Sequence, residues 1–122
     1  MIGIQKKNFP VSGSFTYLDA GGEQAIFEIT ASKFSIIKQI IIDTTTLILD
    51  GTFKVYSKID GTNYRELKND LPFTKATDPA GIIIEANFDY QFSIDTDFKI
   101  TYTESADEGA DRILPYKYIL EK

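Results

Sequence analysis

Short segments that alternate between apolar and polar residues recur along the chain, and turn residues separate them. The clearest segment covers residues 52–58, where Phe53 and Val55 share one face while Lys54 and Tyr56 share the other. A period of two places successive side chains on opposite faces of a β-strand. Asp60-Gly61 follows soon after, and this dipeptide favours a tight turn. The pattern predicts antiparallel strands that bury one face.

Helical patterns are weak by comparison. No window of about a dozen residues keeps apolar positions at three- and four-residue spacing behind a capping residue. The best candidate, residues 31–42, is rich in isoleucine, and β-branched residues favour strands. Further strands are predicted over 14–18, 24–30, 34–43, 44–49, 64–67, 82–88, 90–94, 98–102 and 113–120, with a kink near Lys38-Gln39 and an edge or bulge at Pro115.

The number and spacing of these segments indicate the fold class. About eight or nine short strands, with turns every 8–12 residues, are typical of a sandwich or jelly roll. A chain of 122 residues is close to the commonest domain size. We therefore expect an all-β, single-domain antiparallel β-sandwich over residues 14–122, preceded by an N-terminal arm, residues 1–13, that either docks against a neighbour or frays. The irregular stretch 68–81 is expected to cross between the sheets, although loops of this length are often functional.

Charge and composition exclude several function classes. The chain has neither cysteine nor histidine, which rules out disulfides, a thiolate nucleophile, a Cys/His zinc site and a histidine-based triad. The net charge is −5 and the basic residues are dispersed apart from Lys6-Lys7. We therefore expect no nucleic-acid partner and no membrane partner. The longest apolar runs are far too short to span a bilayer, and no secretion signal is visible at the start.

Carboxylates are the acid–base groups that remain. A glycosidase needs two of them flanking a cleft, and the candidates are Glu28, Glu85, Asp89, Asp95 and Asp97. Acidic residues at strand ends are more often simply solvated, so we expect no catalytic residue. The loop 104–111 holds four carboxylates and a glycine, as a calcium site would. It lacks the EF-hand order, and we expect an ordinary acidic loop without metal or cofactor.

Six tyrosines raise the possibility of a stacking platform for sugars. They are Tyr56, Tyr64, Tyr90, Tyr102, Tyr116 and Tyr118. Aromatic residues on strands more often fill a core or form cross-strand pairs. The chain also lacks tryptophan, so the core interpretation is preferred.

The segment from Gly51 to Tyr64 resembles small β-sandwich structural proteins of tailed bacteriophages. A strand ends in Ser57-x-x-Asp60-Gly61, and the next strand opens with the aromatic Tyr64. Further on, the likeness continues through the strand 98–103, the glycine-containing loop 104–111 and a final strand that ends at Lys122. The same Ser…Asp-Gly…aromatic turn also occurs in galactose-binding-like jelly rolls that bind carbohydrate.

The resemblance implies a non-enzymatic virion protein: a capsid decoration or auxiliary protein, or a head-fibre or neck accessory component. Its partners would be the major capsid protein or neck and tail proteins, and copies of itself in a homo-oligomer. It would assemble in the host cytoplasm and reside in the virion. The contact residues we expect are Phe9, Phe15, Tyr17, Pro72, Phe73 and Pro79. The alternative is a carbohydrate-binding jelly-roll module.

Overall fold

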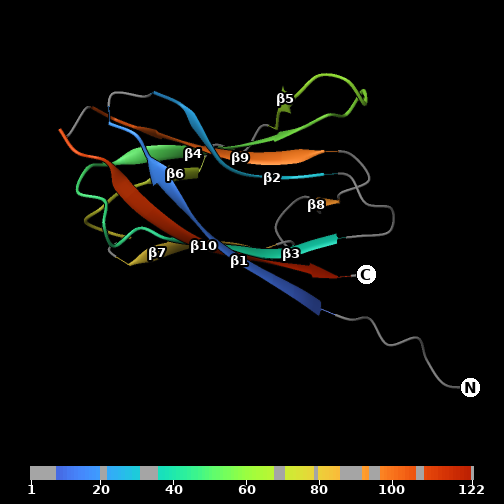
Figure 1. Cartoon of the computed structure of the whole chain (residues 1–122), viewed down its shortest axis with the longest axis horizontal. Helices are drawn as coiled ribbons and strands as arrows, with labels where there is room; N and C mark the ends of the chain where they lie inside the picture. The colour runs from blue at the N-terminus through green and yellow to red at the C-terminus, as the bar shows by residue number, and fades with distance from the viewer. Residues whose placement is uncertain are drawn as a thin grey trace, which may run out of the picture.

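The computed structural model shows two β-sheets packed face to face (Figure 1). It describes residues 8–19, 22–30, 36–67, 71–78, 80–85, 92–93, 97–106 and 109–121. Every regular element in these residues is a strand, and none of them forms a helix that could cross a membrane. All strand pairs are antiparallel. The expected all-β antiparallel sandwich is therefore confirmed.

Each sheet has five strands within the described part of the chain. The first sheet has the order β1-β10-β3-β7, and β8 also pairs with β3; its strands are β1 (Asn8–Tyr17), β10 (Arg112–Glu121), β3 (Ile36–Asp43), β7 (Gly81–Glu85) and β8 (Phe92–Ser93). The second has the order β2-β9-β4-β5, and β6 also pairs with β4; its strands are β2 (Gln24–Ile29), β9 (Phe98–Glu104), β4 (Gly51–Ser57), β5 (Arg65–Glu66) and β6 (Leu71–Phe73). The described residues thus form ten strands, where about eight or nine were expected.

The core lies between the inner faces of the two sheets. Phe53 and Val55 of β4 are fully buried, whereas Lys54 and Tyr56, which alternate with them, are only partly covered, as the pattern predicts. Phe53 packs against Tyr102 with ring centroids 4.7 Å apart. Burying large aromatic rings in this way is the main favourable contribution to folding.

A bulge in β3 confirms the expected kink near Lys38-Gln39. In the pairing with β10, Gln39 lies opposite Ile119 and Ile37 opposite Leu120, so Lys38 is the extra residue. A bulge reverses the side on which the following residues point. Ile37 and Ile40 are therefore both buried although they are three residues apart. Isoleucines on both sides of the bulge thus pack into the core.

The strand predicted over residues 44–49 is wrong. Asp43 ends β3, and its Oδ1 accepts hydrogen bonds from the backbone N–H and the hydroxyl of Thr45, at 2.9 and 2.7 Å. The N–H of Leu47 then donates to the carbonyl of Thr44 at 3.0 Å. Aspartate side chains that bind the nearby backbone compete with strand pairing in this way. The segment is a turn that places Leu47 in the core.

Other predicted boundaries shift where a distant strand decides them. Asn8 to Gly13, part of the predicted arm, belong to β1 and pair with Glu121 to Tyr116 of β10. Residues 1–7 lie outside the described residues, so an arm formed by them stays a prediction. Within the stretch 68–81, Leu71 to Phe73 form β6 against β4. Pro115 does not lie on an edge strand, because β10 runs between β1 and β3, but the pairing with β3 starts only at Tyr116.

Candidate functional site

The outer edge of β1 is the most distinctive surface of the molecule. β1 is the terminal strand of the first sheet and pairs with β10 alone among the described strands. Its pairing runs without a register shift over all ten residues, from Asn8 to Tyr17. None of these residues carries a charge. Proteins usually protect sheet edges with charges, bulges or short strands, because an open edge pairs readily with another chain.

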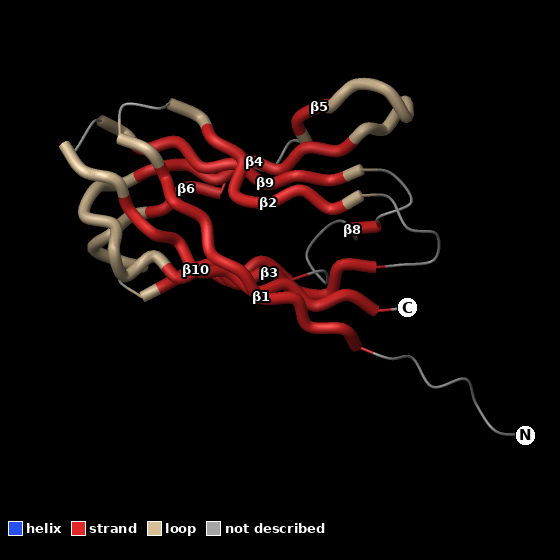
Figure 2. The backbone as a smooth tube through the Cα atoms, viewed as in Figure 1, coloured by secondary structure: helices blue, strands red, loops and turns tan. Residues whose placement is uncertain are grey.

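Two apolar side chains are exposed along the first half of this strand. Phe9 is 42% and Val11 36% exposed, whereas Phe15 packs against the core and Tyr17 is buried. All four lie on the same face of β1, because they alternate along the strand. The two sheets approach each other at the Tyr17 end and diverge towards Asn8 (Figure 2). Phe9 and Val11 therefore point towards the second sheet without being covered by it.

The contacts of Tyr17 show how the closed end of the sandwich is held. Its hydroxyl donates to the Gly22 carbonyl at 2.6 Å and accepts from the Glu104 N–H at 3.2 Å. The ring meets Tyr102 edge to face, with centroids 5.2 Å apart. This side chain links the start of β2 to the end of β9, so it belongs to the core and is not available to a neighbour.

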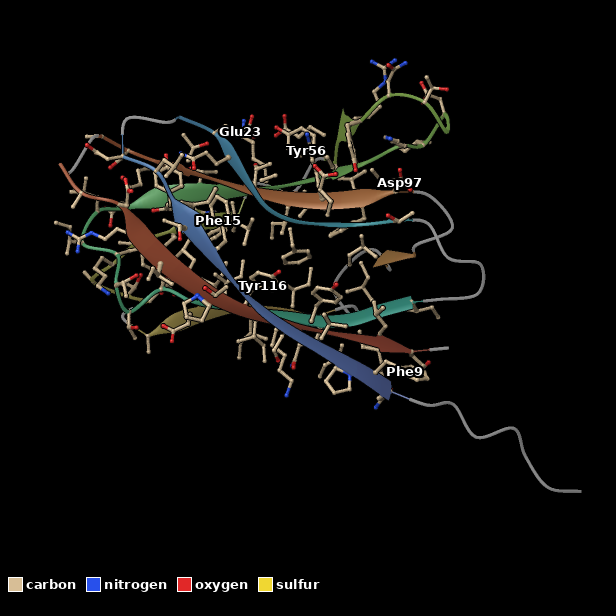
Figure 3. All side chains as sticks on the ribbon, in the orientation of Figure 1. Phe9, Phe15, Glu23, Tyr56, Asp97 and Tyr116 are labelled. Carbon is tan, nitrogen blue, oxygen red and sulfur yellow. The ribbon has the colours of Figure 1, made fainter. Side chains whose placement is uncertain are left out.

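The remaining predicted contact residues divide between surface and core. Figure 3 shows Phe9 near the outer end of β1 and Phe15 nearer the middle of the molecule. Phe73 is buried against Phe53, at a centroid distance of 6.3 Å, while Pro72 is exposed. Pro79 lies outside the described residues. Of the six residues, the structure thus leaves Phe9 and Pro72 on the surface; their role as contacts stays a prediction.

A hollow of about 430 Å³ lies where β4, β6 and β9 meet. Its wall includes Thr52 and Lys54 of β4, Pro72 of β6, and Thr103 and Glu104 of β9. These residues are mixed in character, and Lys54 is already engaged with Glu66, at 3.6 Å between nitrogen and oxygen. The hollow is open to solvent, and its lining residues do not form a set of convergent groups that would favour one ligand.

The outer face of the second sheet carries a hydrogen-bonded network around Glu23, beside Tyr56 in Figure 3. Tyr56 Oη and Thr101 Oγ1 both donate to Glu23 Oε2, at 2.5 and 2.7 Å. Burial disfavours the ionised carboxylate, but the two hydrogen bonds together with the charges of Lys54 and Lys99 outweigh burial and lower the pKa of Glu23. Burial and the bond to Glu23 raise the pKa of Tyr56 to about 12. Near neutral pH the Glu23 carboxyl is thus ionised and the Tyr56 hydroxyl is protonated.

Lysine side chains cover the tyrosine rings on this face. Lys99 Nζ lies 5.0 Å from the ring centroid of Tyr56 and 4.4 Å from that of Tyr64. Lys58 Nζ lies 4.9 Å from the Tyr64 centroid and 3.1 Å from Asp97 Oδ2. These cation–π contacts are attractive and stabilise the surface. The lysines also occupy the faces of the two rings. A sugar would have to displace the lysines in order to stack there.

The other tyrosines of the considered platform lie elsewhere. Tyr102 is buried in the core, and Tyr116 and Tyr118 stack against Phe27 with centroids 4.9 and 4.7 Å away. Tyr90 lies outside the described residues. The five described tyrosines therefore do not share one exposed face, which removes the main support for a carbohydrate-binding module.

Of the carboxylates considered for catalysis, the structure describes the side chains of Glu28 and Asp97, and both lie near Lys58 and Tyr64. Asp97 pairs with Lys58, and Glu28 is exposed on β2. Asp89 and Asp95, the side chain of Glu85, and residues 107–108 of the acidic loop lie outside what the structure describes. Among the described residues, no group of three acidic side chains could hold a metal ion.

Comparisons with known proteins add little to this geometry. No protein-family model and no curated protein matches the chain. One solved chain comes from T=1 particles derived from infectious bursal virus. The match covers 96% of this chain and 31% of that chain, with 15% identity and a TM-score of 0.43. A second solved chain comes from the structure of the Gx strain of infectious bursal disease virus. The match covers 97% of this chain and 32% of that chain, with 14% identity and a TM-score of 0.44.

This chain therefore spans about a third of the length of the solved chains that it matches. Their TM-scores and identities are too low to carry an argument about function. The fold itself rests on the strand pairing described above.

The edge position of β1 does not follow from the strand patterns, although the sequence of β1 carries a signal for it. The run from Asn8 to Tyr17 has no charged residue, while charged residues make up 25% of the chain. Val11, which is exposed beside Phe9, was not singled out. An uncharged run is typical of a buried central strand too, so the signal gains meaning only when the strand is known to be terminal in its sheet.

Proposed function

We propose that this chain is a non-enzymatic structural component of a virion that assembles with other virion proteins. The observation that carries the proposal is the β1 edge: a ten-residue strand with no charged residue, whose exposed side chains include Phe9 and Val11. An edge of this kind favours pairing with another chain. Repeated contacts between β-domains are what a symmetric shell or fibre requires.

The energetics of this edge favour assembly over a permanently exposed surface. Burying a fully exposed apolar side chain contributes about 1.5–3 kcal/mol. Phe9 and Val11 expose only 42% and 36% of their surface, so covering each of them completely contributes about 1 kcal/mol. The added backbone hydrogen bonds replace bonds to water. The gain per copy is modest, so a contact of this size alone gives weak pairing. Many such contacts in one particle act together, which suits a protein held in place by an array.

The sequence resemblance supports a finer proposal. On this proposal the chain would be a capsid decoration or auxiliary protein, or a head-fibre or neck accessory component, of a tailed bacteriophage. The partners would then be the major capsid protein or neck and tail proteins, and assembly would occur in the host cytoplasm. Residues 1–13, including the start of β1, would contribute to contacts with those neighbours.

The direct test is to look for the protein in purified virions from the genome that encodes it. Quantitative mass spectrometry should detect the chain at a fixed copy number per major capsid protein. Immunogold labelling should then show whether it lies on the capsid, the neck or the tail. Absence from purified particles, in a lysate where the chain is abundant, would refute the proposal.

Variants can link particle association to the β1 edge. Phe9→Ser with Val11→Ser should reduce incorporation several-fold at a temperature well below the melting temperature of the variant, where the folded state is still fully populated. A matched control is Ile59→Ser, since Ile59 is 68% exposed in the loop after β4. Equal incorporation of both variants would show that the β1 edge is not the assembly contact.

A further inference from the structure

The edges of the two sheets are not equally protected. β2, at one edge of the second sheet, has six residues, a register shift at Ile26 and the charged Glu28. β5 and β6 have two and three residues, and β7 has five. β1 has ten residues, regular pairing and no charge. Within the described residues, β1 is the edge best suited to bind another strand along its whole length.

Pro10 indicates which backbone groups β1 presents outwards. It lies within β1 opposite Ile119 of β10, and it has no N–H to donate. Proline is tolerated in an edge strand where its nitrogen faces away from the neighbouring strand. Alternate residues share this direction, so Asn8, Ser12, Ser14 and Thr16 direct their N–H groups to the open side. Pro10 contributes a carbonyl there.

We propose that β1 pairs antiparallel with β1 of a second copy of this chain, across a two-fold axis at Ser12. Ser12 then faces the partner's Ser12, Pro10 faces the partner's Ser14, and Asn8 faces the partner's Thr16. Four outward N–H groups from each copy give eight inter-chain hydrogen bonds. The two first sheets become one continuous sheet. This inference rests on the proposed function and names a partner for the same edge.

The side chains on the inner face favour this register. It places the exposed Phe9 beside the partner's Phe15, and Val11 beside the partner's Gly13. Aromatic cross-strand pairs stabilise antiparallel sheets. The Tyr116 phenol lies over Gly13, where a Cβ would collide with it, so the partner's valine would pack against this phenol. Moving the axis to Gly13 would take Asn8 beyond the paired residues and shorten the ladder.

The chemistry of the outer face favours a second copy over an unrelated strand. The outward side chains are Asn8, Pro10, Ser12, Ser14 and Thr16. Hydroxyl and amide groups both donate and accept, so each can face its own equivalent. The overall charge of −5 would oppose close association elsewhere on the surface, but this strand brings no like charges together.

Disulfide trapping tests the register, because the natural chain has no cysteine. Directly opposed residues in such a pair have Cα atoms about 5.5 Å apart, within disulfide reach. Ser12→Cys should therefore form a covalent dimer rapidly under mild oxidation. Ser14→Cys is the matched control: both side chains are exposed hydroxyls, but two copies of residue 14 would lie about 13 Å apart along the strands. Similar cross-linking at both positions would overturn the register.

Sedimentation analysis tests the dimer without cross-links. The natural chain should show a concentration-dependent dimer, and Ser12→Ala should retain it. Ser12→Lys should weaken the dimer at least ten-fold, because two ammonium groups would meet at the axis. Its melting temperature, measured when dilute, should match that of Ser12→Ala. A natural chain that stays monomeric at high concentration, or a dimer insensitive to Ser12→Lys, would overturn the inference.

The outcomes separate this inference from the proposed function. A monomer that is nevertheless found in virions leaves the virion role intact and removes the self-pairing. A dimer with the Ser12 cross-link that is absent from virions supports the self-pairing and removes the virion role.

Discussion

Replacing Gly51 with alanine is expected to destabilise the fold by overpacking. A Cβ at Gly51 would lie 2.5 Å from Cε1 and Cζ of Tyr102 and closer still to its hydroxyl. The Tyr102 ring is buried and held between Phe53, 4.7 Å away, and Tyr17, 5.2 Å away by ring centroids. It has little room to move aside. Forcing an extra carbon into a packed core costs about 1–3 kcal/mol.

Equilibrium unfolding in urea measures this loss, and a double-mutant cycle identifies its cause. Tyr102→Leu removes the ring atoms that the new methyl group would meet. Gly51→Ala should therefore cost little in that background, with a coupling energy of about 1 kcal/mol or more. Gly61→Ala is a control, because Gly61 has φ +80° in open space and its cost should not depend on Tyr102. Additive effects of Gly51→Ala and Tyr102→Leu would refute the steric explanation.

Three further outcomes are expected. The backbone N–H groups of Thr62 and Asn63 lower the pKa of Asp60 from 3.8 to about 2. The Asp60 carboxylate therefore stabilises the fold above about pH 4, and this contribution is lost as the pH falls through about 2. Asp60→Asn should therefore flatten the acid dependence of thermal melting, and an unchanged profile would contradict this. Glu23→Gln should lower the pKa of Tyr56 from about 12 towards 10 in an ultraviolet titration, unless burial alone sets it. Phe27→Ala should cost about 3 kcal/mol in urea unfolding, because Phe27 stacks on Tyr118 at 4.7 Å; a loss below about 1 kcal/mol would show that this contact does not join the sheets.

Local alternation was enough to predict the strands that have one buried and one solvated face. β4 is the best case, since Phe53 and Val55 are buried while Lys54 and Tyr56 reach the outer surface. The kink near Lys38 was also visible, because two adjacent polar residues interrupt a run of isoleucines. In both cases the information lies within a few residues, and the physical cause is the same separation of apolar from polar side chains.

Prediction failed where a side chain or a distant strand decided the local structure. Asp43 captures the N–H of Thr45 and ends β3, so the apolar residues that follow cannot continue a strand. In the opposite direction, the segment around Pro10 and Gly13 looks like an arm, but β10 pairs with it residue by residue. Neither residue pattern specifies its partner, because pairing between positions about 100 residues apart depends on the whole topology.

The assignment of contact residues depended on the same information. Tyr17 and Phe73 are aromatic like Phe9 and Phe15, yet they are buried because they face the opposite sheet near its closed end. Exposure of an aromatic residue on a strand is thus decided by where the two sheets diverge, which no local pattern records.

The lack of charge in β1 illustrates why an edge is harder to recognise than a core strand. With 25% of the chain charged, a stretch of ten residues would ordinarily carry two or three charges. In a central strand their absence needs no explanation, because both neighbours exclude water. In an edge strand the same absence removes the usual protection against pairing. Pro10 lacks an N–H group and so offers no donor at its position, but four other outward N–H groups of β1 remain open. Proteins usually protect an open edge with charges such as lysine, and β1 has none at Ser12, Ser14 or any other position; the pairing proposed for this edge requires such an uncharged strand.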